Sequence, residues 1–204
     1  RDLDRHGMLL TIHDEVDPNL EMAEIHRQIF EQQGPAILFK RVKGSPFEAV
    51  SNVYGTFERT AWLFRHSLDA VKRVIELKKD PTSLLKKPGR YLGAPLTALS
   101  ALPMRSWLGS PVTYGTTTVG QLPQIKSWQM DGGAFITMPQ VYTEDPDRPG
   151  PMNANLGMYR IQLSGNDYVP NQEVGMHYQL HRGIGVHHTQ YNRSELPFRC
   201  SIFV

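Results

Sequence analysis

The sequence has very little cysteine and no long apolar run. Its single cysteine, Cys200, cannot form an internal disulfide, so a cytoplasmic protein is the default expectation. No apolar stretch approaches the roughly 18–20 residues that a membrane-spanning helix needs. The charged opening RDLDRHG does not resemble a signal peptide, so the sequon Asn192-Arg193-Ser194 is interpreted as a chance match.

An excess of charge of one sign is also absent. The 22 Lys and Arg residues nearly balance the 20 Asp and Glu residues, which leaves a net charge of +2. A nucleic-acid-binding protein normally carries a clustered basic excess, so the composition gives no support to that class. The length of 204 residues and the hydrophobic share of 40% fit one or two ordinary globular domains.

Several familiar catalytic motifs are missing. The sequence has no paired zinc-type cysteines and no serine nucleophile elbow. The stretch GTTTVG (115–120) lacks the Gly-Lys-Ser/Thr ending of a nucleotide-binding phosphate loop. Cys200 lies in an apolar run, and we expect a small buried hydrophobic residue there rather than a nucleophile.

Both ends of the sequence are unusual for a complete domain. The chain begins with Arg1 rather than Met, and it stops on the apolar run CSIFV with no turn after it. We therefore expect a piece of a longer polypeptide.

Residues 1–80 have the pattern of a mixed α/β domain. LLTIHDEVDP predicts a strand, and Asp17-Pro18 predicts the start of a helix with a core face of Met22, Ile25 and Ile29. AILF (36–39) and AVSNVYG (49–55) predict two further strands. TFERTAWLFRH and SLDAVKRVIELKK predict helices with hydroxyl caps, the second with Leu68, Val71 and Ile75 facing the core.

The chain changes character after residue 80. Six prolines within residues 81–123 forbid long regular elements, so this segment is predicted to be a connector between domains. From 124 to 204 the pattern is strand-like, in FITMPQVYT, LGMYRIQLSG, VGMHYQLHRG and FRCSIFV. Successive strands without helical patterns between them favour an antiparallel sheet or barrel, which makes the expected fold class α+β.

The densest group of polar residues is MHYQLHRGIGVHH (176–188). On a strand, His177, Gln179 and His181 would share one face, and the following glycines would allow close approach of a ligand. A metal or phosphate site and a polar strand face without a ligand are equally compatible with this spacing. His187 and His188 are adjacent, and we expect them to be solvated loop residues.

Two other stretches carry polar residues beside apolar ones. In NANLGMYRIQL (153–163), Asn155 and Arg160 are five residues apart, so a regular strand places them on opposite faces unless Gly157 breaks the alternation. Alternatively, Arg160 is a surface residue of an edge strand. In DGGAFITMP (131–139), Asp131 and Thr137 are more simply explained by bonds to nearby backbone than by a ligand.

Taken together, these residues resemble the UbiD-type family of reversible decarboxylases that use prenylated FMN. LLTIHDEVDPNLEMAEIHRQ, GPAILFKRVKGS and NVYGTFERTAWL are similar to its amino-terminal domain, and LPQIKSWQMDGGAFITMP to the entry of its cofactor domain. NLGMYRIQ and MHYQLHRG are similar to its central cofactor and metal strands. The resemblance implies an amino-terminal α/β domain (1–80), a connector (81–123) and the first part of a flavin-reductase-like split β-barrel (124–204).

The resemblance also implies residue roles. Asn155 and His181 match ligands of a divalent ion, Mn²⁺ or Mg²⁺, that bridges to the flavin phosphate, and a monovalent cation such as K⁺ belongs to the same cofactor set. Arg160 matches the active-site arginine, which in the family pairs with two acidic residues. The matched flavin contacts are Met158, Tyr159, Arg160, His177, Tyr178, Gln179, Arg182 and Gly183.

The implied reaction is decarboxylation of an aromatic or α,β-unsaturated acid through a covalent adduct with prenylated FMN. The family's third metal ligand, its acidic proton donor and its carboxy-terminal assembly domain lie beyond Val204, so these 204 residues alone are expected to be incomplete. A homo-oligomer or a second chain is expected to complete the site. The alternative is a non-catalytic flavin-phosphate-binding or assembly module with the same fold.

Overall fold

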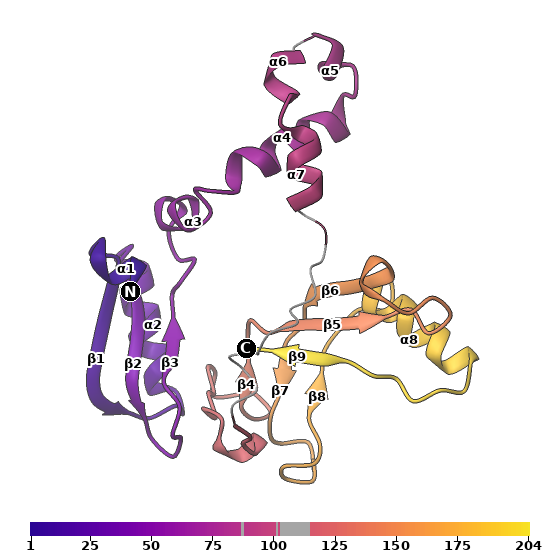
Figure 1. The fold of residues 1–204 in the computed structure, drawn as a ribbon. Coiled ribbons are helices and arrows are strands. Elements are labelled where there is room, and N and C mark those ends of the chain that lie inside the picture. Colours follow the sequence, from indigo (N-terminus) through magenta and orange to yellow (C-terminus); the bar gives the residue numbers. More distant parts are fainter. Residues whose placement is uncertain (87, 101, 103–114) are drawn as a thin grey trace.

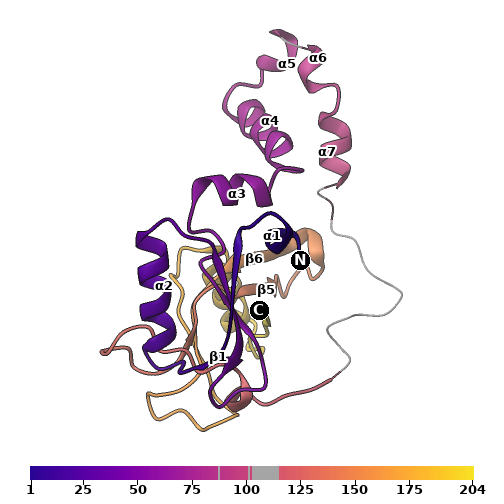
Figure 2. The ribbon, with the colours of Figure 1, turned by 90° about the vertical axis from the view of Figure 1, so that its left-hand side faces the viewer.

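The computed structural model describes residues 1–86, 88–100, 102 and 115–204 (Figure 1). In this part of the chain the strands form three separate three-stranded sheets. One sheet belongs to the amino-terminal region and two belong to the carboxy-terminal region, and a group of helices projects away from all three (Figures 1 and 2).

The amino-terminal sheet has the order β1-β2-β3. Strand β1 (Leu9–Val16) is parallel to β2 (Ala36–Val42), and β3 (Ala49–Ser51) pairs antiparallel with β2. Helix α2 (Glu21–Glu31) connects the parallel pair, and the short α1 (Asp2–Arg5) precedes β1. The predicted strands and the predicted helix are thus confirmed for this region.

The core of this region lies between the sheet and α2. Its buried members are Val16, Met22, Ile37, Phe39 and Val42. Ile25 and Ile29 pack against this cluster, as the helical spacing predicted. The predicted helix start at Asp17-Pro18 is wrong, because α2 begins at Glu21 and the Asp17 carboxylate instead accepts a bond from the Asn19 N–H.

In the described part of the chain, five consecutive helices follow β3 and lead away from the sheets. They are α3 (Phe57–Leu63), α4 (Leu68–Lys79), α5 (Ser83–Lys86), α6 (Pro88–Tyr91) and α7 (Ala94–Ser100). Thr56 caps α3 through the Arg59 N–H, as predicted. The predicted core face of α4 is wrong: none of its residues is buried, and Val71 is 50% exposed, because α4 lies in the projecting group rather than against a sheet (Figure 1).

A strap, residues 119–126, connects the two cores. It begins with the 3₁₀ turn η1 (Val119–Gln121), and Val119 and Leu122 pack against the carboxy-terminal core. Ile125 packs instead against the amino-terminal core. The Lys126 backbone bonds to Pro18 and Leu20, both at 3.0 Å, so this segment is fastened to the β1–α2 loop.

The carboxy-terminal strands are all antiparallel and form two sheets. The first contains β4 (Phe135–Ile136), β7 (Ile161–Gln162) and β8 (Gly175–Met176). The second contains β5 (Gln140–Glu144), β6 (Ala154–Met158) and β9 (Ser201–Phe203), with β5 in the centre. The 3₁₀ turn η2 (Pro151–Asn153) leads into β6, and α8 (Gly183–Arg193) follows β8.

The core of this region contains Ile184 of α8 together with four residues from or beside the strands. These are Ala134, Val141, Ile161 and Leu163. Antiparallel pairing is confirmed for this region. The described strands do not close into a barrel, so the split barrel stays a prediction.

Three local predictions for this region are wrong. Strand β8 ends at Met176, so His177, Gln179 and His181 do not lie on a strand. His187 and His188 lie in α8 rather than in a loop, and His187 is buried. Cys200 is exposed, because the adjoining strand β9 is at the edge of its sheet, although burial by neighbouring atoms still raises the pKa of its thiol.

Candidate functional site

The candidate site is centred on the break between β6 and β7. Strand β6 pairs regularly with β5 from Ala154 to Met158, so Asn155 lies inside the strand and Gly157 carries no bulge. The chain leaves the regular ladder at Tyr159 and Arg160 before β7 begins. The expected kink therefore exists, but it falls two residues after the predicted position.

Gly157 is required by the ring of Tyr159. A Cβ atom at position 157 would lie 2.6 Å from the nearest ring atom of Tyr159. The Tyr159 hydroxyl in turn receives a bond from the Asn155 amide at 3.4 Å. The side chain of Tyr159 thus folds back along β6, which positions the Asn155 amide.

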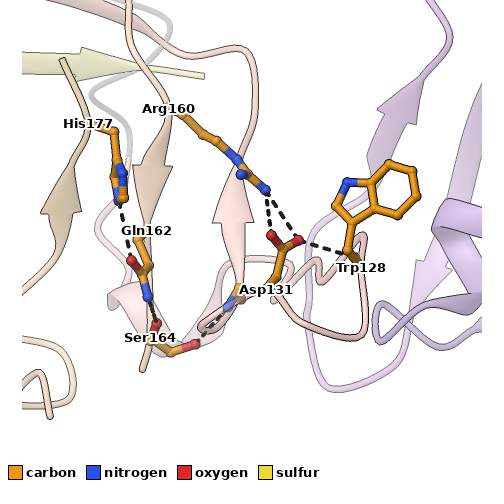
Figure 3. A network of polar contacts seen from close by, with 7 residues as sticks. Trp128, Asp131, Arg160, Gln162, Ser164 and His177 are labelled. Carbon is orange, nitrogen blue, oxygen red and sulfur yellow. Dashed lines mark hydrogen bonds and ion pairs between the residues drawn. The ribbon is translucent and has the colours of Figure 1, made fainter. Parts of the chain in front are cut away.

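Arg160 points to the opposite end of the site, where it is held by an aromatic ring and a carboxylate. Its guanidinium carbon lies 3.7 Å above the centre of the Phe135 ring, within the range of a cation–π contact. Its Nη2 atom lies 3.3 Å and 3.4 Å from the two carboxylate oxygens of Asp131 (Figure 3). The Arg160 side chain keeps 37% of its surface exposed, so its position is defined while part of it stays accessible.

His177 belongs to a second set of polar contacts beside Arg160. Its Nε2 lies 3.3 Å from the side-chain oxygen of Gln162, whose amide nitrogen donates to the Ser164 carbonyl at 3.0 Å (Figure 3). The His177 ring also contacts the Phe135 ring edge-on at 5.6 Å. Gln162 is buried, so the exposed imidazole of His177 is bonded to a side chain that the core holds in place.

The other end of the site is the amino terminus of α8. Arg182 is the N-cap and makes no side-chain capping bond, so the first-turn N–H groups of Gly183, Ile184 and Gly185 have no partner within the helix. A helix start of this kind binds anions, phosphate in particular. A Cβ atom on Gly183 would lie 2.2 Å from Asn155 Oδ1, so the amide occupies the space that a larger residue would fill.

Asn155 and His181 are the two residues matched to metal ligands. Gly183, which touches Asn155, follows His181 by only two residues, and His181 is exposed. An amide oxygen and an imidazole suit a divalent ion such as Mn²⁺, and the free N–H groups of α8 suit a phosphate. Across the described residues, no three His, Cys, Asp or Glu side chains form a metal cluster, and the metal roles of Asn155 and His181 stay predictions.

Tyr178 places an aromatic ring between Tyr159 and α8. Its hydroxyl bonds to His188 Nδ1 of α8, and its ring meets the Tyr159 ring edge-on at 6.4 Å. Burial raises the pKa of the Tyr178 hydroxyl. His188 stacks on Phe198 at 4.8 Å, which fixes the imidazole that bonds to this hydroxyl.

The remaining matched residues are less enclosed. Met158 ends β6 and is exposed, and Gln179 is exposed in the turn before α8, where its carbonyl accepts the Arg182 N–H at 3.0 Å. No contact in the described residues links either side chain to Arg160. The structure therefore groups Asn155, Tyr159 and Gly183 closely, while these two lie at its margin.

Sequence reasoning missed three residues that hold the site together. Asp131 was expected to bond nearby backbone, and its bond from the Trp128 N–H confirms this, but its contact with Arg160 was missed. Phe135 and Thr143 were interpreted only as strand residues. An aromatic residue following Asp-Gly-Gly is a weak signal, and only the fold shows that it lies under the guanidinium.

Comparison with known proteins gives two matches to one family. Residues 1–78 match the model of the 3-octaprenyl-4-hydroxybenzoate carboxy-lyase N-terminal domain, and residues 110–204 match the Rift-related domain of the same carboxy-lyase. In the described part of the chain, no helix has the length and apolar character that crossing a membrane requires.

Curated relatives are much longer than this chain. An uncharacterised protein of Chlamydia trachomatis is 38% identical over 200 residues, which covers 96% of this chain and 33% of the relative. A 4-hydroxybenzoate decarboxylase subunit of Chlamydia pneumoniae is 36% identical and is covered to 32%. The chain thus spans about a third of the length of these relatives.

Solved structures share the fold. The closed form of vanillic acid decarboxylase from Sedimentibacter hydroxybenzoicus superposes with a TM-score of 0.72 at 23% identity, covering 98% of this chain and 40% of that one. The enzyme HmfF from Pelotomaculum thermopropionicum, solved with prFMN, gives a TM-score of 0.68 at 21% identity, covering 98% and 42%. The mixed α/β arrangement with small sheets is therefore common to this chain and these structures.

Proposed function

We propose that this chain, which belongs to the UbiD carboxy-lyase family, is the amino-terminal and cofactor-binding part of a decarboxylase that uses prenylated FMN. The reaction is the reversible, non-oxidative removal of carbon dioxide from an aromatic or α,β-unsaturated carboxylic acid. The observation that carries the proposal is Arg160, a partly exposed guanidinium fixed over Phe135. The hydroxyl of its neighbour Tyr159 accepts a bond from Asn155 of β6, which lies against Gly183 at the start of α8.

The α8 end of the site is suited to the cofactor phosphate. The N–H groups of Gly183, Ile184 and Gly185 would donate to the phosphate at the helix start, where the helix dipole favours negative charge. Asn155 and His181 would hold Mn²⁺ or Mg²⁺ there, and a nearby monovalent cation such as K⁺ belongs to the same proposal. Tyr178 and His177 would contact the ring system between the two ends.

Arg160 would bind the substrate. A guanidinium pairs with a carboxylate through two parallel hydrogen bonds, which fixes the orientation of the acid as well as its position. Orientation of the carboxylate relative to the reacting carbon lowers the entropic part of the barrier. When bound, prenylated FMN supplies the electron sink that loss of carbon dioxide requires.

The full enzyme would need more than these residues. A third metal ligand and a proton donor would come from the rest of a longer polypeptide or from a second chain, and the assembly would be oligomeric. The name of the Chlamydia pneumoniae relative, which describes one subunit of a decarboxylase, supports a protein with several subunits. Within this proposal residues 1–80 are the amino-terminal domain, 81–123 the connector, and 124–204 the first part of a split barrel.

The role of Arg160 can be tested in the full-length polypeptide. Arg160→Ala should abolish decarboxylation because the substrate carboxylate loses its partner, whereas flavin and metal should remain bound. Turnover is measured by product chromatography across a panel of aromatic and alkenyl acids, and cofactor content by absorption and mass spectrometry. Near-normal turnover by Arg160→Ala would rule out this role.

The phosphate end can be tested by cofactor content alone. Asn155→Ala and His181→Ala should each lose manganese by elemental analysis and flavin by absorbance, because the ion that bridges to the phosphate loses a ligand. Losses of about tenfold or more in affinity are usual when a metal ligand or its support is removed. His66→Ala, an exposed histidine remote in sequence, is the control. Plain FMN without metal or turnover in the wild type would favour the binding module instead.

A further inference from the structure

Asp131 lies against the guanidinium that would bind the substrate. Both of its oxygens approach Arg160 Nη2, at 3.3 Å and 3.4 Å, across 29 positions of sequence. Its side chain is only 12% exposed, so water screens this carboxylate poorly. A fixed negative charge therefore stands beside the place where a second carboxylate would dock.

The position of Asp131 is fixed by its own loop. The Trp128 N–H donates to Oδ2 at 3.1 Å (Figure 3). Beyond Gly132 and Gly133, the Ala134 N–H donates to the Ser164 hydroxyl at 3.1 Å, and the Leu163 N–H donates to the Ala134 carbonyl at 2.7 Å. Because the loop is tied at both ends, Asp131 cannot easily swing away when a ligand arrives.

The geometry of Arg160 leaves room for that ligand. Both contacts with Asp131 use Nη2, while Phe135 supports the flat face of the guanidinium. A planar guanidinium has five N–H donors, so a carboxylate can bind another edge while Asp131 keeps its place. Two carboxylates would then share one positive charge.

We propose that Asp131 is a positioning residue that orients Arg160 and, by charge repulsion, weakens binding of the substrate carboxylate relative to the transition state. This inference rests on the proposed function. When the bond between the carboxylate carbon and the substrate skeleton breaks, carbon dioxide leaves uncharged and the electron pair stays on the skeleton, for which prenylated FMN would be the acceptor. The repulsion with Asp131 is relieved in that step, so it lowers the barrier measured from the bound state.

The test compares charged and neutral ligands on the full-length polypeptide. In Asp131→Asn, a non-reacting aromatic carboxylate should bind about three- to tenfold more tightly by calorimetry, as expected for the loss of one nearby, partly screened like charge. The matching aromatic amide should bind with unchanged affinity. Steady-state kinetics should show a lower KM together with a lower kcat, the combination that indicates lost ground-state repulsion.

Matched variants separate this effect from others. Asparagine keeps an oxygen that accepts the Trp128 N–H, and Asp131→Ser is a second neutral variant with a shorter side chain. Asp131→Glu retains the charge and should retain wild-type carboxylate affinity within about twofold. Asp167→Asn removes an exposed charge elsewhere in this region and should change nothing.

The outcomes are distinct. Unchanged or weaker carboxylate affinity in both neutral variants overturns the proposal, as does equal tightening in Asp167→Asn. Tightening that extends to the amide also overturns it, because a neutral ligand feels no charge repulsion. A different result is possible, in which Asp131→Asn binds the carboxylate more tightly but the wild type turns over no acid. That result would reject the decarboxylase, while the repulsion between Asp131 and a bound carboxylate would still hold.

Discussion

At the scale of single residues, Thr143 and His187 make the most enclosed polar contact of the site region. Their side chains bond at 2.9 Å, and they are 1% and 9% exposed. Thr143 belongs to β5 and His187 to α8, so this bond holds the helix on the sheet. A buried polar group that loses its partner costs far more than an exposed one, because no water replaces the partner.

Thr143→Val should therefore destabilise the protein by about 1–3 kcal/mol, since valine keeps the shape of threonine but leaves the His187 nitrogen without a partner. The measurement is chemical denaturation of the full-length polypeptide. Thr137→Val is the matched control, because Thr137 is exposed and should tolerate the change within about 0.5 kcal/mol. Equal effects of the two substitutions would show that the bond to His187 adds nothing.

Sequence reasoning predicted some single residues correctly and missed others. Helical spacing correctly placed Met22, Ile25 and Ile29 on the amino-terminal core, because one-sided burial imposes its period on the sequence. The partnership of Asp131 with Arg160 could not be predicted, because it joins residues 29 positions apart through a loop geometry. The metal and flavin roles of the matched residues remain predictions.

At the scale of elements, the carboxy-terminal strands are short and their ends determine the site. Apolar and aromatic runs predicted strand-like stretches of seven to ten residues, whereas β4, β7 and β8 each contain two. Alternation in the sequence indicates which residues can be extended, but hydrogen-bond partners decide where a ladder stops. For this reason the break at Tyr159 and Arg160 was assigned to Gly157.

Two adjacent glycines illustrate how closely these elements approach. A Cβ atom on Gly133 would lie 1.9 Å from the Ser164 carbonyl oxygen, a backbone atom that cannot move independently. A Cβ atom on Gly132 would meet only the side-chain ends of Gln162 and Asn166, at 3.3 Å and 3.5 Å. The loop that carries Asp131 thus depends on one glycine much more than on its neighbour.

Gly133→Ala should lower the free energy of unfolding by about 1–3 kcal/mol or more, because the backbone must shift to relieve the overlap. Gly132→Ala should cost less than about 1 kcal/mol, since flexible side chains can adjust. Thermal unfolding of both variants provides the comparison. A reversed order would mean that the close approach of residues 133 and 164 is not maintained in solution.

At the scale of the whole molecule, the strap (residues 119–126) joins two cores that share no buried residue among those the structure describes. Ile125 packs on the amino-terminal core, while Val119 and Leu122 pack on the carboxy-terminal one. The backbone bonds of Lys126 add a fixed point on the β1–α2 loop. The prolines in this part of the chain predicted a connector, but nothing in their spacing indicated that its end is packed on both sides.

Ile125→Ala should reduce stability by about 1–3 kcal/mol, less than a fully buried isoleucine because Ile125 is only partly enclosed. Faster amide exchange should appear in β1 and β2, the strands beneath the lost side chain, as measured by hydrogen-exchange mass spectrometry. Val204→Ala, at a residue that is 84% exposed, should leave both readouts unchanged. Faster exchange confined to the carboxy-terminal sheets would contradict this assignment of Ile125.

The pairing of β5 with β6 has a consequence for how the sequence can evolve. Thr143 and Asn155 are direct partners across these strands, and they meet α8 at His187 and Gly183, positions one helical turn apart. A change at any of these four positions alters how α8 packs on β5 and β6. The residues at the other three positions should therefore constrain which substitutions are accepted. Across relatives, a residue larger than glycine at 183 should therefore accompany a smaller residue at 155, and loss of the imidazole at 187 should accompany loss of the hydroxyl at 143.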